Sequence, residues 1–368
     1  MENAKILFIA PLPPPVTGQS LAAKRLLQEL EKDHSVRCID FSKGTFDQGL
    51  SSVSRLLQVC KILNEIRAKQ KSADAIYLTL SQSVAGNVKD LVTYAICFRK
   101  LGRTVLHLHG GGIARIVFNR HPILRRINKF FLKRVGAAIV LSPSLRETFA
   151  GMVPDERIHT IANFAQDEFF LDTEQIQSKF RATQPLRLLF LTNLLKGKGF
   201  NELANAYDLL SLTSQNKVQV DFAGEFGSER EKRSFLANIR GKPAVRYHGV
   251  VEGDKKRQLL ADAHILCLPT YYAYYEGQPI AILEGYASGC AVITTNHGGI
   301  PDIFDPGQTG FYVEKQSARS IADAIETLLR NPKDLERIAV YNNSLARTLY
   351  TESRSLSSLA EVIKEVLK

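Results

Sequence analysis

Short apolar runs alternate along the chain with longer segments in which apolar residues recur every three or four positions. The run Lys5–Ala10 is typical of a buried strand, and Ser20–Lys32, with its leucines on one face, is typical of an amphipathic helix. The same alternation predicts further strands in the first 165 residues at Val36–Phe41, Ala75–Leu80, Thr104–His109, Ala137–Leu141 and Ile158–Ile161. It predicts the intervening helices at Val53–Ala68, Val84–Leu101, Ile123–Arg134 and Ser144–Ala150.

After a polar stretch, Gln166–Pro185, that has the character of a linker, the alternation starts again. The predicted strands of this second series are Leu186–Thr192, Val218–Ala223, Val245–His248, His264–Leu268 and Ala291–Thr295. The predicted helices are Phe200–Leu212, Ser228–Ile239, Lys255–Ala261, Pro279–Ser288, Ser317–Leu329, Asp334–Leu349 and Ser355–Leu367.

Strands that alternate with helices at this spacing indicate an α/β fold with parallel sheets covered on both faces. We therefore predict two doubly wound, Rossmann-like domains that face each other across a cleft, comprising residues 1–165 and 166–349. In sheets of this kind, ligands bind beyond the carboxyl ends of the strands.

Composition narrows the class of protein. A hydrophobic content of 45% with 23% charged residues is that of a globular chain, and no apolar run is long enough to cross a bilayer. The beginning of the sequence lacks a basic leader and a cleavage site, so no signal peptide is expected. The five cysteines are scattered and never spaced as CxxC, which favours reduced thiols. These features predict a cytoplasmic location.

Positive charge is concentrated in the first half of the sequence. Residues 1–165 hold 24 Lys and Arg against 12 Asp and Glu, whereas residues 166–368 hold 24 against 25. Residues 115–134 carry seven cations and no acid, interleaved with Ile and Phe. This pattern is typical of a helix on an anionic membrane surface or of a funnel towards a lipid diphosphate, although a helix with a merely solvated basic face would look the same. A nucleic-acid-binding protein is disfavoured, because no RNP-type aromatic signature or zinc spacing accompanies the charge.

Candidate chemistry lies in loops that follow predicted strands. The segment Pro11–Ser20 contains Gly18, which can let a ligand approach the start of a helix, or the segment is simply a rigid turn. Thr192–Gly199 places two lysines beside two glycines, which suits an oxyanion as well as a solvated turn. His109, at the end of a strand, is followed by three glycines and is predicted at the rim of the crevice.

Two carboxylates stand out in the segment Pro269–Glu284. Glu276 lies in the loop, and Glu284 lies within an apolar helical stretch where an unpaired carboxylate would be costly. Sugar hydroxyls are suitable partners for such groups, and a surface salt bridge is the alternative for Glu284. A further glycine-rich turn follows at Thr294–Asp302. The sequence contains no Asp-x-Asp, so a metal-held diphosphate is not expected.

Taken together, these segments resemble the retaining glycosyltransferases of family 4, which have the two-domain GT-B architecture. The resemblance spans nearly the whole chain, and its most specific part runs from Glu276 through Glu284 to Gly298-Gly299-Ile300-Pro301. Supporting parts are the proline-rich loop with Gly18, the His-Gly-Gly-Gly run at His109, Asn163, Lys198-Gly199 and His248-Gly249.

The resemblance implies roles for individual residues. Glu276 and the backbone of Gly277, Gln278 and Pro279 would hold donor-sugar hydroxyls, Glu284 would accept the ribose hydroxyls, and Lys198 would neutralise the departing diphosphate. Gly18 would let the diphosphate approach, and His109 would line the reacting face. An arginine that the family often has before the lysine is absent here, where Thr192 and Asn193 stand, so Asn193 is counted with the donor site. The C-terminal helix, about residues 350–368, would complete the N-terminal domain.

These implications amount to a hexosyltransferase that retains configuration, uses no metal or other cofactor, and takes its sugar from a nucleotide sugar. We expect a polyprenyl-diphosphate-linked glycan as acceptor in surface polysaccharide assembly, and peripheral association with the inner face of the cell membrane. A sugar-nucleotide epimerase or a phosphorylase of the same fold is the alternative. An epimerase would change a nucleotide sugar with no acceptor present, and a phosphorylase would need free phosphate.

Overall fold

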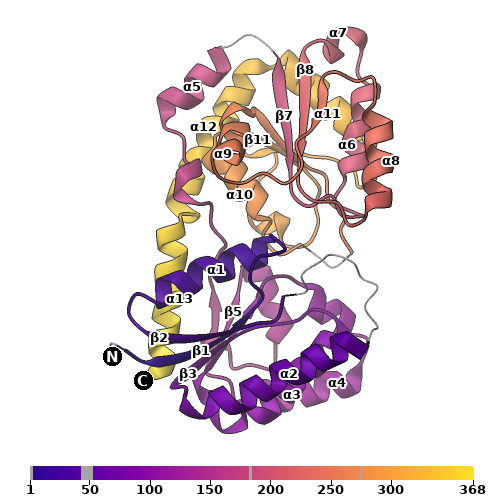
Figure 1. Cartoon of the computed structure of the whole chain (residues 1–368). Coiled ribbons are helices and arrows are strands. Elements are labelled where there is room, and N and C mark those ends of the chain that lie inside the picture. Colours follow the sequence, from indigo (N-terminus) through magenta and orange to yellow (C-terminus); the bar gives the residue numbers. More distant parts are fainter. Residues whose placement is uncertain (1–2, 43–52, 182–184, 274–275) are drawn as a thin grey trace. The chain divides into compact units, whose positions relative to one another are not determined.

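The computed structural model describes residues 3–42, 53–181, 185–273 and 276–368, which divide into two compact units. The first unit comprises Met1–Ala162, Ser353–Lys368 and a short piece that ends at Gln278, and the second comprises the rest. Each unit contains its own six-stranded parallel sheet (Figure 1). The predicted α/β class, with two doubly wound sheets, is therefore confirmed.

In the N-terminal unit the strand order is β2-β1-β3-β4-β5-β6, so the direction of winding reverses between β1 and β3. The strands are β1 (Lys5–Ala10), β2 (Ser35–Asp40), β3 (Ala75–Thr79), β4 (Thr104–Leu108), β5 (Ala137–Val140) and β6 (Ile158–Thr160). The main helices are α1 (Gly18–Leu30), α2 (Val53–Lys69), α3 (Val84–Ile96), α4 (Pro122–Leu132) and α13 (Glu352–Leu367).

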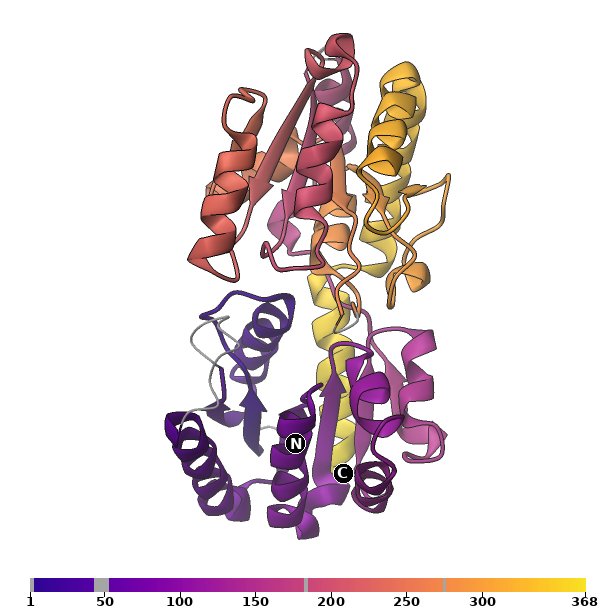
Figure 2. The ribbon, with the colours of Figure 1, turned by 90° about the vertical axis from the view of Figure 1, so that its right-hand side faces the viewer.

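Each face of the first sheet is covered by helices. Helices α2, α3 and α4 lie next to one another on one face, and α13 lies on the other (Figures 1 and 2). β3, β4 and β5 are buried along their full length, as expected for central strands between two helical layers. The helix predicted over Val84–Leu101 ends at Ile96 and continues as a 3₁₀ turn over Phe98–Arg103.

In the C-terminal unit the strand order is β12-β11-β10-β7-β8-β9, with the reversal between β7 and β10. The strands are β7 (Leu186–Leu191), β8 (Val218–Ala223), β9 (Val245–Tyr247), β10 (Ile265–Leu268), β11 (Ala291–Thr294) and β12 (Gly310–Tyr312). The helices are α5 (Thr173–Arg181), α6 (Phe200–Asp208), α7 (Leu212–Gln215), α8 (Glu229–Ile239), α9 (Gly253–Asp262), α10 (Ile280–Ala287), α11 (Ala318–Arg330) and α12 (Pro332–Leu349). α6, α8 and α11 lie on one face of the sheet, and α9, α10 and α12 on the other (Figure 1).

Three elements of this unit differ from the prediction. The helix predicted over Phe200–Leu212 ends at Asp208, and a separate short helix, α7, follows at Leu212–Gln215. The sequence analysis did not predict β12, which has only three residues and begins with a glycine. The stretch expected to be a linker contains α5, whose Ile176 is 1% exposed. Lys179 of α5 donates to the carbonyls of Ala263 and Ser288, both at 2.7 Å. These residues end α9 and α10, so the lysine satisfies carbonyls at two helix C-termini and anchors α5 to this unit.

The C-terminal helix α13 packs in the N-terminal unit. Its buried side chains include Leu359 and Ile363, and the hydroxyl of Ser355 donates to the carbonyl of Ala162 at 2.8 Å. A Cβ atom added to Gly136 would lie 2.9 Å from the side chain of Val366, so this helix passes close to the backbone before β5. In the described part of the chain, no helix combines the length and the apolar character that a membrane span requires.

Candidate active site

The loops that follow β7 and β10 meet at the point where the second sheet reverses its winding. β7 and β10 are adjacent parallel strands, and both loops leave from their carboxyl ends. The backbone N–H of Tyr271 donates to the carbonyl of Gly197 at 2.7 Å, and the Thr270 hydroxyl donates to the same carbonyl at 3.3 Å. The two loops are thus tied together where open α/β sheets place their ligands.

Two glycines allow this close approach. Gly199 has a φ of +88°, and a Cβ atom there would lie 2.4 Å from the Pro269 carbonyl oxygen. Gly197 has a φ of +92°, and its Cβ atom would lie 3.1 Å from the Cα of Tyr272. Side chains at these positions would be strained and would push the two loops apart. The sequence analysis predicted this loop as an anion site, and the structure adds the reason for both glycines.

Lys198 lies between these glycines, immediately before α6. Its ammonium nitrogen is 4.7 Å from the centroid of the Tyr272 ring, a cation–π contact that holds the side chain beside the loop after β10. Gly199 is the N-cap residue of α6, so backbone N–H groups at the start of that helix lie close by. A lysine at a helix N-terminus makes a suitable place for a diphosphate.

Glu284, in α10, is 2% exposed and pairs with Lys256 of α9 at 2.6 Å. Burial raises the pKa of Glu284, and the attraction of Lys256 opposes that shift. Only Oε1 of the carboxylate has a hydrogen-bond partner among the described residues. Oε2 therefore keeps its capacity to accept hydrogen bonds. The sequence analysis did not identify Lys256, which lies 28 residues away in the chain and whose ammonium also lies 4.8 Å from the Phe169 ring.

The segment before α10 is buried. Glu276 is 7% exposed and Gln278 is 6% exposed, and Pro279 is the N-cap residue of α10. A Cβ atom at Gly277 would lie 2.4 Å from the carbonyl oxygen of His109, so this position requires glycine. Tyr274 and Tyr275, which belong to the same predicted loop, lie outside the described residues.

His109 follows β4, and both nitrogens of its ring are buried without a hydrogen-bond partner among the described residues. Its ring stacks against that of His107 with 3.9 Å between centroids, and His107 Nδ1 is 2.7 Å from the Tyr77 hydroxyl. Burial lowers the pKa of His109 to about 4, so the imidazole is neutral at physiological pH. The residue as a whole is half-buried, and its position at the rim of a crevice stays a prediction.

The remaining predicted residues also follow strands. Gly18 is the first residue of α1, after the N-cap Thr17, whose side chain accepts a hydrogen bond from the backbone of Ser20. Asn193 follows β7, and its side-chain oxygen accepts a hydrogen bond from the Glu225 backbone at 3.3 Å.

The predicted residues fall into two groups. Lys198, Asn193, Pro279 and Glu284 belong to the C-terminal unit. Gly18, His109 and the segment 276–278 belong to the N-terminal unit.

Residues 172–344 match the model of the family described as glycosyl transferases group 1. The match runs from the residue before α5 into α12 and so covers most of the C-terminal unit. This part of the chain is therefore similar to that family, and the loops with Lys198 and Glu284 lie inside the matched region.

The chain is similar in sequence to the amylovoran biosynthesis glycosyltransferase AmsK of Erwinia amylovora, with 23% identity over 272 residues. The aligned region covers 72% of this chain and 64% of AmsK, so the chain spans less than two thirds of that relative. Among solved structures, Anabaena HepE in complex with UDP and glucose superimposes with a TM-score of 0.74 at 16% identity, over 98% of this chain and 100% of HepE.

WaaG, a glycosyltransferase involved in lipopolysaccharide biosynthesis, superimposes with a TM-score of 0.71 at 14% identity, over 97% of this chain and 99% of WaaG. At these identities the solved structures establish the fold, which is GT-B as predicted.

Proposed function

We propose that this chain is a glycosyltransferase that moves a hexose-type sugar from a nucleotide sugar to a glycan acceptor in surface polysaccharide assembly. The observation that carries the proposal is the pair of joined loops within the region that matches glycosyl transferases group 1. These loops bring a lysine and a helix N-terminus to one edge of the sheet. The names of AmsK and WaaG and the nucleotide bound to HepE support this proposal.

In the proposed reaction, the charge of the leaving diphosphate is stabilised by the protein. Lys198 and the backbone N–H groups at the start of α6 would neutralise the departing oxyanion, and the backbone at Gly18 would let it approach. Fixed charges of this kind contribute strongly to such reactions because they need no reorganisation. We propose that the reaction requires no metal, consistent with the absence of Asp-x-Asp from the sequence.

The donor would be recognised through carboxylates. Oε2 of Glu284, which keeps its accepting capacity, would bind ribose hydroxyls, while Lys256 fixes the position of the carboxylate. Glu276, with the backbone of Gly277, Gln278 and Pro279, would hold the hydroxyls of the sugar. We propose retention of configuration, with attack from the side of the leaving group and no protein nucleophile.

His109 would face the acceptor as a neutral imidazole. Because its pKa is lowered to about 4, it can accept a hydrogen bond from an acceptor hydroxyl at physiological pH, and it carries no positive charge that would oppose an oxocarbenium-like carbon. Its two unpartnered nitrogens, among the described residues, are the groups that a bound acceptor could satisfy.

A panel of nucleotide sugars tests the donor proposal through thermal unfolding. We expect one donor class to raise the Tm, because a ligand that binds only the folded state stabilises it. The Lys198→Ala variant should lose this shift, and Asp208→Asn should keep it. Asp208 is a matched control because it forms an ion pair of 2.6 Å with Lys242 away from the loops. If no nucleotide sugar raises the Tm of the wild-type protein, the proposed function is wrong.

The acceptor proposal rests on the surface of α3 and α4, which we call the α3–α4 face. Six large apolar side chains are exposed there. Five have helical spacing, Val88 and Val92 in α3 and Ile123, Ile127 and Phe130 in α4, and the sixth is Phe98 in the 3₁₀ turn that follows α3. The two helices are joined by reciprocal hydrogen bonds between the side-chain amides of Asn87 and Asn128, at 3.1 and 2.9 Å. Phe98 stacks on Phe130 with 6.1 Å between ring centroids. Exposed apolar clusters of this extent indicate an interaction surface.

The charges around the α3–α4 face are almost all positive. Between residues 84 and 135 the only acid is Asp90, which is buried and pairs with Lys89 at 2.6 Å. Arg134 lies over the rings of Phe98 and Phe130. An apolar surface surrounded by cations favours an anionic lipid leaflet. We therefore propose that this face docks on the inner surface of the membrane, where a polyprenyl-diphosphate-linked glycan would be the acceptor.

Flotation with vesicles that contain anionic phospholipid tests the membrane proposal. We expect binding at low salt, weakened by salt, and at least a tenfold loss in the double variant Ile127→Ser with Phe130→Ser. Leu212→Ser is the matched control, since Leu212 is 79% exposed in α7 of the other unit. Equal flotation of both variants, or none by the wild-type protein, would contradict the proposed docking.

A further inference from the structure

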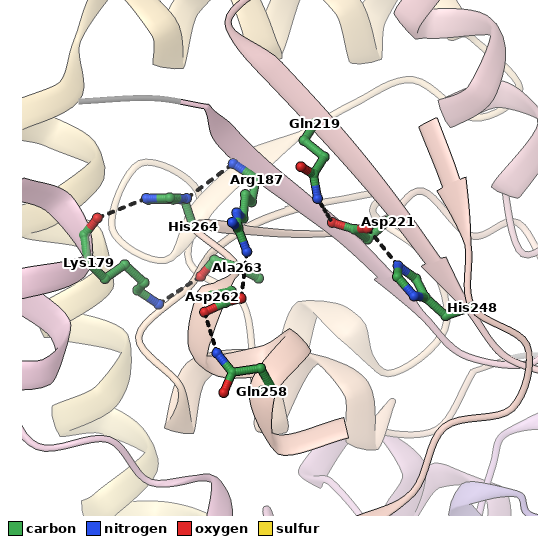
Figure 3. Close-up of polar contacts among 9 residues, drawn as sticks. All are labelled: Lys179, Arg187, Gln219, Asp221, His248, Gln258, Asp262, Ala263 and His264. Atoms are coloured by element: carbon green, nitrogen blue, oxygen red, sulfur yellow. Dashed lines mark hydrogen bonds and ion pairs between the residues drawn. The ribbon is translucent and has the colours of Figure 1, made fainter. Parts of the chain in front are cut away.

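The C-terminal unit contains a polar cavity of about 200 Å³ between α9 and the strands β7, β8 and β9. It is lined by Arg187, Leu189, Gln219, Asp221, Arg246, His248, Leu259, Asp262 and Ala263. Figure 3 shows several polar members of this set, with Asp221 between Gln219 and His248, and Arg187 beside Asp262. The volume is well above the ~10–15 Å³ that one water molecule needs, so a small molecule fits.

The position of the cavity within the sheet is unusual. The register aligns Arg187 with Gln219 and Asp221 with Arg246, so β7, β8 and β9 each place a polar residue at the cavity. Leu189, which is aligned with Asp221, is an apolar member of the lining. The next residues in the same register are Phe190, Phe222 and Tyr247, which form an aromatic row on the opposite face. The inner strands of parallel sheets normally present apolar residues to both helical layers. The polar side is therefore a specific feature of this sheet.

The acidic groups of the cavity already have partners. Asp221 is 4% exposed, and its two oxygens accept hydrogen bonds from His248 Nε2 at 2.6 Å and from Gln219 Nε2 at 2.7 Å. Asp262 accepts from Arg187 Nη1 at 2.5 Å and from Gln258 at 2.7 Å. Each oxygen of both carboxylates thus already accepts one hydrogen bond from a protein group.

The donors of the cavity retain unused capacity. No described residue accepts a hydrogen bond from the guanidinium of Arg246, and Arg187 uses one nitrogen of its side chain on Asp262. A guanidinium has five N–H donors in a planar fork that matches phosphate. Arg246 is exposed, so the cavity reaches the surface at its position. The groups left for a ligand are therefore mainly cationic donors.

We propose that this cavity is a second ligand site, separate from the proposed donor site, which binds the phosphate group of a small phosphate ester or free phosphate. Arg246 and Arg187 hold the phosphate oxygens, and the Asp221–His248 pair and Gln219 form the polar wall behind them. The ligand is small, because the cavity is smaller than the ~300 Å³ at the lower end of ordinary ligand pockets.

Calorimetric titration of the full chain, at constant ionic strength, tests this site with inorganic phosphate and with glycerol 3-phosphate. We expect saturable binding of one equivalent, at least tenfold weaker in Arg246→Ala. The exposed Arg230 of α8 provides the matched control, and Arg230→Ala should bind as the wild type does. Tighter binding of glycerol 3-phosphate identifies an organic ester as the ligand, and equal binding identifies the phosphate group alone.

The Lys198→Ala variant separates this site from the proposed donor site. If phosphate binds in the cavity, the variant keeps the affinity of the wild-type protein, whereas loss of binding would place the phosphate at the loop after β7. Equal affinity in Arg246→Ala and the wild type, or no saturable binding of either probe, would overturn the proposal. Because the readout is phosphate binding, its failure leaves the nucleotide-sugar test unaffected.

Discussion

Two hydrogen-bonded pairs of an acidic and a basic side chain in the C-terminal unit have nearly the same geometry and different surroundings. Glu284–Lys256 and Asp221–His248 both have N···O distances of 2.6 Å. The acidic side chains are 2% and 6% exposed, and the basic ones 16% and 20%. The first pair joins two helices, α9 and α10, whereas the second joins β8 to the residue that follows the edge strand β9.

The difference lies in how many carboxylate oxygens each pair uses. Both oxygens of Asp221 accept hydrogen bonds from protein groups, whereas Glu284 uses one among the described residues. A carboxylate whose two oxygens both accept hydrogen bonds from the protein has a structural role, whereas one with an oxygen that accepts none can bind a ligand hydroxyl. Distance and burial alone would have assigned the two pairs the same role.

The largest effect expected is on activity. Replacing Glu284 by Ala should lower kcat/KM for the nucleotide sugar by about 100-fold, because the open carboxylate oxygen is lost from the donor site. The Asp221→Ala variant should change kcat/KM by less than threefold. Steady-state kinetics, with circular dichroism to confirm folding, compares the two variants. Similar losses in both would show that the open oxygen does not distinguish the pairs.

Acid should act on the neighbourhood of the second pair. His264 accepts from the Arg187 backbone and contacts the Lys179 carbonyl, and burial lowers its pKa to about 4. The unfolded state then binds more protons between pH 6.5 and 4, so stability falls as pH falls through this window, by up to about 3 kcal/mol from this group. Glu284, with its raised pKa, acts in the opposite direction.

Urea unfolding at pH 5 and pH 7.5 measures this dependence. The variant His264→Gln should lose less stability on acidification than the wild-type protein, because it removes one buried neutral histidine. If the free energy of unfolding changes between the two pH values by the same amount in His264→Gln and in the wild-type protein, His264 does not contribute to the pH dependence.

Removing the acid of the second pair should have a moderate effect on stability. Asp221→Ala leaves His248 and Gln219 without their acceptor, which is expected to cost about 1–3 kcal/mol. A double-mutant cycle with His248→Ala should give a coupling energy of about 0.5–3 kcal/mol. Additive losses would show that the contact contributes no stability of its own.

The smallest effect is expected at the opening of the cavity. Arg246→Ala should change the free energy of unfolding by less than about 0.5 kcal/mol, because the side chain is exposed and no described residue accepts its hydrogen bonds. Chemical denaturation of both variants, Arg246→Ala and Asp221→Ala, compares the contributions of these two side chains to the free energy of unfolding. A loss as large as that of Asp221→Ala would mean that Arg246 stabilises the fold.

The fold was largely predictable because both sheets consist of strongly apolar strands separated by amphipathic helices. α5 was not predicted because Ile176 and Phe180 give it too few apolar positions for a periodic signal, and its anchor, Lys179, acts through carbonyls that no sequence pattern reveals. Within the proposed site, Lys198 and Glu284 were identifiable by residue type in context. Lys256 was not, since pairing across helices depends on tertiary packing.

The cavity escaped prediction for a related reason. The pattern of Val218–Ala223 predicts a strand, and Gln219 and Asp221 at alternate positions are typical of the exposed side of an edge strand. In the structure β8 lies between β7 and β9, and Asp221 is buried. Strand order decides whether an alternating strand is an edge or is enclosed, and the sequence pattern does not contain that order.

The packing of α13 in the N-terminal unit has a consequence for how the protein is made. Residues 3–162 leave the ribosome long before residues 353–368, and the whole C-terminal unit is translated between them. The N-terminal unit therefore cannot complete its packing until α13 has been synthesised, and until then the surface beside Gly136 is uncovered. The C-terminal unit, although it is translated later, can fold first. Translation order and the order of completion are thus reversed in this molecule.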